Sequence, residues 1–95
     1  MPASTNQLLT PITTTVNQNG HLSIGGCDLI ELAQKYATPL YVFDEETIRA
    51  VCRDYKNAFS SYEKVNMMYA SKALCSLATS ALIASEGFGF DVVSG

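Results

Sequence analysis

A lysine placed directly after an apolar run is the residue of this chain best suited to covalent chemistry. Lys72 follows the run VNMMYA, residues 65–70, by about one residue, and the nearest other charges are Lys64 and Glu86. In water an amine with a pKa of about 10.4 is almost wholly charged, so it attacks a carbonyl only where burial lowers that pKa. The neutral amine could then form an imine with an aldehyde. The spacing equally fits a solvated or snorkelling lysine, and both interpretations stay open.

The elements on either side of Lys72 predict a strand–helix–strand unit. Residues 65–70 are apolar enough for a strand buried on both faces, and FDVV, residues 90–93, predicts a second short strand. Between them the pattern is helical, and Gly87 ends the helix. Such a unit of about thirty residues implies parallel strands. One side of the predicted helix is formed by Leu74, Leu77, Ala78, Ala81, Leu82 and Ser85.

This unit determines where its polar residues should lie. Lys72 falls at the carboxyl end of the first strand, and active sites of α/β proteins lie at that end. We expect Asp91 at the start of the second strand and Ser94-Gly95 at its carboxyl end. Lys72 and the Ser-Gly turn would then share one rim of the sheet.

The first part of the chain predicts a β-hairpin. ITTTV, residues 12–16, is rich in β-branched residues, and HLSI, residues 21–24, would be the returning strand. Asn19-Gly20 between them is a two-residue turn signal, because both positions tolerate positive φ. An isolated hairpin is marginal in water, so this one needs a partner sheet.

Two amphipathic helices and a short strand should follow the hairpin. Residues 28–36 carry apolar side chains at helical spacing, with Asp28 as the cap and Pro39 forbidding continuation. LYVF, residues 40–43, predicts a strand, and Asp44 caps a second helix. The buried stripe of that helix is predicted to be Ile48, Val51, Cys52, Tyr55 and Phe59, with Arg49, Arg53 and Lys56 on the opposite side.

Composition excludes several functional classes. The 95 residues carry a net charge of −3, which gives no basic face for nucleic acid, and no apolar run is long enough for a membrane helix. Cys27, Cys52 and Cys75 stand more than twenty residues apart without a CxxC pair. We therefore expect reduced thiols in a reducing cytosol, with neither a disulfide framework nor a metal site. Because a βαβ unit cannot close its own sheet, we expect the front part of a longer α/β protein.

Three stretches in order carry a family resemblance. YASKAL, residues 69–74, resembles the Tyr-Ala-x-Lys-Ala motif of fold-type III pyridoxal-phosphate decarboxylases, and GFGFDVVSG, residues 87–95, resembles their Gly-x-Gly-x-Asp-Val-x-Ser stretch. Residues 25–49, GGCDLIELAQKYATPLYVFDEETIR, are similar to the beginning of the barrel in diaminopimelate decarboxylases in particular. In this chain Leu74 stands where the family often has Asn, and Ala37 where it often has Gly.

The resemblance implies a fold and a domain organisation. The family fold is a (β/α)8 TIM-type barrel with a separate β-domain, so this chain would be an α/β fragment that begins such a barrel. Residues 1–10 would be a flexible N-terminus, residues 11–26 N-terminal strands joining the β-domain, and residues 27–95 the first helices and first βαβ unit of the barrel. A barrel needs about 250 residues, so we expect these residues alone to be inactive.

The resemblance also implies site residues and a reaction. Lys72 would hold pyridoxal 5'-phosphate as a Schiff base, with Ala70, Asp91 and Ser94 near the cofactor. The implied reaction is decarboxylation of meso-diaminopimelate to L-lysine and carbon dioxide by a cytoplasmic homodimer. Alternatives are a decarboxylase of arginine, ornithine or carboxynorspermidine, a non-catalytic pyridoxal-phosphate-binding barrel, and a structural α/β fragment with an exposed lysine. Neither a nucleic acid nor a membrane is an expected partner.

Overall fold

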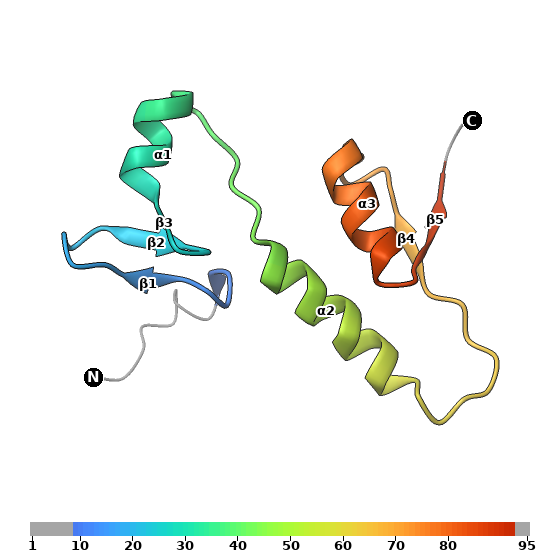
Figure 1. Ribbon diagram of the computed structural model, residues 1–95. Coiled ribbons are helices and arrows are strands. Elements are labelled where there is room, and N and C mark those ends of the chain that lie inside the picture. The colour runs from blue at the N-terminus through green and yellow to red at the C-terminus, as the bar shows by residue number, and fades with distance from the viewer. Residues whose placement is uncertain (1–8, 93–95) are drawn as a thin grey trace. The chain divides into compact units, whose positions relative to one another are not determined.

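The computed structural model describes residues 9–92 as a mixed α/β chain that divides into two compact units. The first unit extends to Thr47 and the second begins at Ile48, within helix α2 (Figure 1). The elements in chain order are β1 (Thr15–Val16), β2 (Leu22–Ile24), β3 (Cys27–Asp28), α1 (Leu29–Tyr36), α2 (Glu45–Ala58), β4 (Met68–Ala70), α3 (Leu77–Ser85) and β5 (Gly89–Asp91). None of the helices in residues 9–92 is long and apolar enough to cross a membrane.

The first unit contains a three-stranded antiparallel sheet of order β1-β2-β3. The predicted hairpin is present, with Val16 opposite Leu22, but the third strand was not predicted. The first strand is also shorter than predicted, because Thr14 N donates to Pro11 O and makes a turn of residues assigned to that strand. The sheet therefore contributes two- and three-residue strands only.

The turn of the hairpin also differs from the prediction. Asn17 N donates to His21 O at 2.8 Å, and Gly20 N donates to Asn17 O at 3.0 Å. The connection is thus a three-residue loop between Asn17 and His21, with Gly20 at φ 74°. The Asn-Gly pair marked the turn correctly, but the Asn17 side chain also accepts from the N–H groups of Asn19 and His21 and lengthens it.

Asp28 joins this sheet to helix α1 and caps the helix as predicted. One carboxylate oxygen accepts from Ile30 N and Glu31 N, while the other is 2.7 Å from Asn17 Nδ2 and 2.8 Å from His21 Nδ1. Burial raises the pKa of Asp28, but the hydrogen bonds outweigh it and lower that pKa to about 2. One carboxylate therefore stays charged while it holds both the turn of the hairpin and the start of the helix.

Helix α1 ends at a residue in an unfavourable backbone conformation. Ala37 has φ 66° and ψ 173°, a region that residues with a Cβ rarely adopt. We expect Ala37→Gly to stabilise the protein by about 1 kcal/mol, because glycine removes this strain and offsets its own entropy cost. Thermal unfolding of the full-length variant measures the gain. Ala81→Gly, at an exposed position in the interior of α3, is the control and should destabilise by about 1 kcal/mol. A loss of stability in Ala37→Gly would contradict the assignment of strain.

The predicted strand at residues 40–43 is not a strand in the structure. These residues pair with none of the described strands, and Tyr41 and Phe43 are 90% and 57% exposed. Their composition favours a strand, but a strand also needs a neighbour that supplies hydrogen bonds. Asp44 then caps α2 as predicted: its buried carboxylate accepts from Thr47 N at 3.2 Å and from Thr47 Oγ1 at 2.5 Å.

The second unit contains the predicted βαβ arrangement. Strands β4 and β5 are parallel neighbours, with Met68 opposite Gly89 and Ala70 opposite Asp91, and α3 connects them (Figure 1). The strands are shorter than predicted, and burial of β4 on both faces is not observed: Met68 is 62% exposed. Within the described residues β4 has a single neighbouring strand, which leaves one edge and much of one face uncovered.

Helix α3 is oriented differently from the predicted stripe. Ser76 caps it and exchanges bonds with Thr79, and the buried apolar side chain is Ile83, at 6% exposure. Leu77, predicted on the buried side, is 93% exposed. Almost every position of this helix is apolar or small, so its sequence pattern could not select one face.

Helix α2 packs through a face that agrees only in part with the one predicted. Arg49 and Arg53, predicted to face away from the packed side, donate to the Glu86 carboxylate at 3.0 and 3.2 Å. Of the predicted stripe, Cys52 is buried as expected, whereas Val51 and Tyr55 are about half exposed. Glu86 is itself buried, and a buried carboxylate requires cationic partners. This requirement determines the packed face within the second unit.

Candidate functional site

The candidate site lies at the carboxyl ends of the two parallel strands. Ala70 and Asp91 are the last residues of β4 and β5 and stand opposite each other in the ladder. Lys72 follows Ala70 by two residues, in a turn closed by a bond from Ala73 N to Ala70 O. The amine-bearing residue and the carboxylate-bearing residue therefore share one rim of the sheet.

The position of Asp91 corrects one prediction. The sequence placed this residue at the start of the second strand, whereas the structure places it at the end. The reason is that pairing begins earlier, because Gly89 N donates to Met67 O at 2.8 Å. Asp91 thereby moves from the amino rim to the rim that carries Lys72. Ser94, the other residue predicted on this rim, lies outside the described residues.

The Lys72 side chain is exposed, which agrees with the solvated one of the two interpretations that the sequence left open. No described residue covers it, because β4 has one strand neighbour and α3 starts five residues after Lys72. Burial that would favour the neutral amine is therefore not provided by residues 9–92. What these residues do provide is an accessible primary amine at a defined point of the backbone.

Two residues missed by the sequence analysis fix the turn that carries Lys72. Ser71 is buried, and both its backbone N–H and its hydroxyl donate to the Asp91 carbonyl, at 3.2 and 2.9 Å. The Tyr69 hydroxyl donates to Leu74 O at 2.7 Å, and its ring packs edge-on against Phe90. The alternation of a strand is the available sequence signal: Tyr69 and Ser71 point to the face opposite Ala70.

The chemistry available at this rim is that of an amine and a carboxylate beside a small side chain. Lys72 could form an imine with an aldehyde. The Asp91 carboxylate could stabilise a positively charged group of a ligand. Ala70 leaves open space beside them because its side chain is small and exposed. Among the residues that the structure describes, no group of three or more His, Cys, Asp or Glu side chains is arranged to hold a metal ion. The buried Cys52 is not a competing nucleophile, because burial raises the pKa of its thiol.

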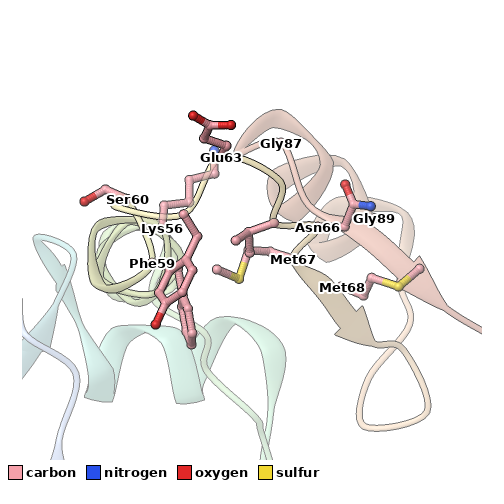
Figure 2. Close-up of a pocket in the computed structure, with 11 residues that line it drawn as sticks. Lys56, Phe59, Ser60, Glu63, Asn66, Met67, Met68, Gly87 and Gly89 are labelled. Atoms are coloured by element: carbon pink, nitrogen blue, oxygen red, sulfur yellow. The ribbon is translucent and has the colours of Figure 1, made fainter.

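A pocket of about 400 Å³ lies at the opposite rim of the same unit (Figure 2). Its lining includes Met68 and Gly89, the first residues of β4 and β5, together with Lys56 and Phe59 at the end of α2 and just beyond it. Figure 2 shows these groups around Met67, next to the amino ends of the strands. Since Lys72 and Asp91 lie at the carboxyl ends, this pocket does not belong to the candidate site.

Comparisons with known proteins identify diaminopimelate decarboxylases among the relatives of this chain. The chain is 45% identical over 94 residues to diaminopimelate decarboxylase of Synechocystis sp., covering 97% of this chain and 20% of that protein. It is 54% identical to the Bacillus methanolicus and 50% identical to the Bacillus subtilis diaminopimelate decarboxylase, each over 84 residues, 87% of this chain and 19% of the relative. No family model matches the chain. The chain spans about a fifth of the length of these curated relatives.

Proposed function

This chain corresponds to the N-terminal portion of the diaminopimelate decarboxylases, and we propose that the whole protein decarboxylates meso-diaminopimelate to L-lysine and carbon dioxide. The observation that carries the proposal is the match over 97% of the chain combined with the position of Lys72. In α/β enzymes the reactive groups lie at the carboxyl ends of the parallel strands, and Lys72 lies at such an end. The match supports the reaction, and the place of Lys72 at the strand end supports its proposed role as the lysine that binds the cofactor.

The residues of the carboxyl rim fit pyridoxal phosphate. The cofactor requires an accessible primary amine, and Lys72 is exposed in a turn that is fixed to the neighbouring strand. It also requires room beside that amine, which the short side chain of Ala70 leaves at the strand end. When bound, the cofactor supplies an aldehyde for linkage to the lysine. It also supplies a pyridine ring that accepts the electron pair left behind when the substrate carboxylate departs as carbon dioxide.

Each residue on this rim has a separate role in the proposal. Lys72 would hold the cofactor through its amine, and the same nitrogen could hold or donate a proton at Nζ. Asp91 stands opposite Ala70 across the ladder and is proposed to place its carboxylate on the rim that carries Lys72. Ser94 is proposed as a further cofactor contact on the basis of the family motif alone.

The two units of this chain are proposed to belong to two domains of the whole protein. We assign the βαβ unit to the start of a (β/α)8 barrel and the antiparallel sheet of the first unit to a β-domain, with the whole protein acting as a homodimer. The relatives, about five times as long as the matched stretch, leave room for both domains. Light scattering on the full-length protein measures the dimer directly.

A substrate panel tests the proposed function. The purified full-length protein is first loaded with pyridoxal phosphate. It is then incubated with meso-diaminopimelate, arginine, ornithine or carboxynorspermidine in separate reactions, and the release of carbon dioxide is measured. We expect release with meso-diaminopimelate and formation of L-lysine in equal amount. Turnover of one of the other three substrates alone would reassign the specificity. Cofactor binding without release from any of them would favour a non-catalytic carrier.

A further inference from the structure

The turn that carries Lys72 is attached to the rest of its unit by the residue directly before the lysine. Ser71 is 8% exposed, although serine is usually found at the surface. Its N–H continues the β4–β5 ladder by one bond beyond Ala70, and its hydroxyl gives a second bond to the same acceptor, the Asp91 carbonyl. A carbonyl oxygen has two lone pairs and can accept both.

The two hydrogen bonds from Ser71 to one carbonyl restrain more than the pairing of the strands. A backbone bond alone leaves the side chain of residue 71 free to rotate, whereas the hydroxyl bond fixes its χ1 and the residue's orientation relative to β5. Because Lys72 is the next residue, the direction in which its side chain leaves the backbone is fixed as well. The accepting carbonyl belongs to Asp91. The backbone at Lys72 and the backbone at Asp91 are therefore held together by the same pair of hydrogen bonds.

A second bond closes the turn from its far side. The Tyr69 hydroxyl donates to Leu74 O at 2.7 Å, and Ala73 N donates to Ala70 O at 3.2 Å. Among the residues that the structure describes, none anchors the Lys72 side chain in this way, and that side chain is exposed. The restraint on the lysine therefore comes from its neighbours in sequence.

From this arrangement we infer that Ser71 is a positioning residue for Lys72, whose hydroxyl holds the lysine in the direction needed to meet the aldehyde of the cofactor. The inference rests on the proposed function, because it assumes that Lys72 binds pyridoxal phosphate. It adds a residue that acts through the lysine without touching the cofactor. Loss of the hydroxyl should weaken cofactor binding by about fivefold, the effect of one neutral hydrogen bond.

The test is a titration of the full-length apoprotein with pyridoxal phosphate, followed by the visible absorbance of the linked cofactor. Ser71→Ala should bind about fivefold more weakly than wild type, and Ser71→Thr, which keeps a hydroxyl, should recover most of the loss. Ser60→Ala is the matched control: it also removes a hydroxyl that donates to a backbone carbonyl, Asn57 O at 2.8 Å, but far along the chain from Lys72. Its affinity should equal that of wild type.

A second readout separates positioning from general stability. The pH at which the absorbance of the bound cofactor changes should shift in Ser71→Ala and stay unchanged in Ser60→Ala, while the two variants unfold at similar temperatures. Tyr69→Phe removes one oxygen, keeps the ring against Phe90, and gives an independent measure with an expected loss of about two- to threefold.

The outcomes distinguish the inference from the function on which it rests. If wild-type protein binds no pyridoxal phosphate, the proposed function fails and the inference falls with it. If wild type binds the cofactor and Ser71→Ala binds it equally well, with the same absorbance profile, only the inference is overturned. It is also overturned if Ser71→Thr is folded but as weak as Ser71→Ala.

Discussion

Full-length Lys72→Ala protein is expected to show no measurable decarboxylation, a loss of at least about a thousandfold, and no covalent attachment of pyridoxal phosphate. The side chain removed is the primary amine at the rim that carries Asp91, and none of the other described lysines lies at a strand's carboxyl end. Borohydride reduction followed by peptide mass analysis measures the attachment, which in wild type should map to the peptide containing Lys72.

Lys72→Arg is the control that separates charge from covalent chemistry. It keeps a cation at the same point of the turn, but a guanidinium does not lose its proton in proteins and cannot form the imine. We expect this variant to unfold at the wild-type temperature, since Lys72 is exposed, and to be as inactive as Lys72→Ala. Labelling of a different lysine in the wild-type protein, or residual turnover above a hundredth of wild type in either variant, would remove Lys72 from the site.

Features with a local physical cause were predictable from the sequence. The carboxylates of Asp28 and Asp44 cap helices because each accepts from N–H groups within three residues, a relation that the sequence shows directly. The parallel pairing of β4 and β5 was predictable for a similar reason, since a strand–helix–strand unit of this length leaves few other arrangements. The position of Lys72 just after the carboxyl end of β4 was predictable because the lysine interrupts an apolar pattern there.

Features that depend on distant partners were not predictable. Residues 40–43 have the composition of a strand but no described neighbour, so composition alone gave the wrong element. The packed face of α2 depends on Glu86, which lies 37 residues after Arg49 and appears in no local pattern. Asp91 was placed on the wrong rim because the sequence could not show that pairing begins at Gly89.

The second large effect is expected at Glu86, where α3 ends. Its carboxylate is buried and accepts from Arg49 and Arg53, with Arg49 about one-third and Arg53 about two-thirds exposed. Glu86→Lys would place a third cation beside Arg49 and Arg53 and remove the carboxylate that accepts from both. We expect the full-length variant to unfold at least roughly 10 °C lower than wild type, or to accumulate as insoluble protein.

Two further variants locate the cause of that effect. Glu63→Lys makes the same change at an exposed glutamate of the same unit and should shift the unfolding temperature by less than about 2 °C. Adding Arg49→Glu to Glu86→Lys restores a pair of opposite charges and should recover part of the loss, because Arg49 is the less exposed of the two arginines. Equal shifts in Glu86→Lys and Glu63→Lys would show that the buried pair contributes nothing.

The same carboxylate predicts how stability depends on pH. The hydrogen bond from Arg49 lowers the pKa of Glu86, and the Arg53 guanidinium lowers it further against an opposing effect of burial. A carboxyl whose pKa is lower in the folded state contributes stability that is present above its unfolded pKa of about 4.3 and is lost as the pH falls through the folded pKa. Glu86→Gln removes this titration. The difference in unfolding temperature between wild type and Glu86→Gln should therefore be constant from pH 7 to about pH 5 and shrink below about pH 4. A difference that grew on acidification would contradict the pairing. Glu86 lies at the end of α3, where the segment that leads into β5 begins. Replacing Glu86 should therefore also displace Asp91 and weaken cofactor binding by the protein that remains folded.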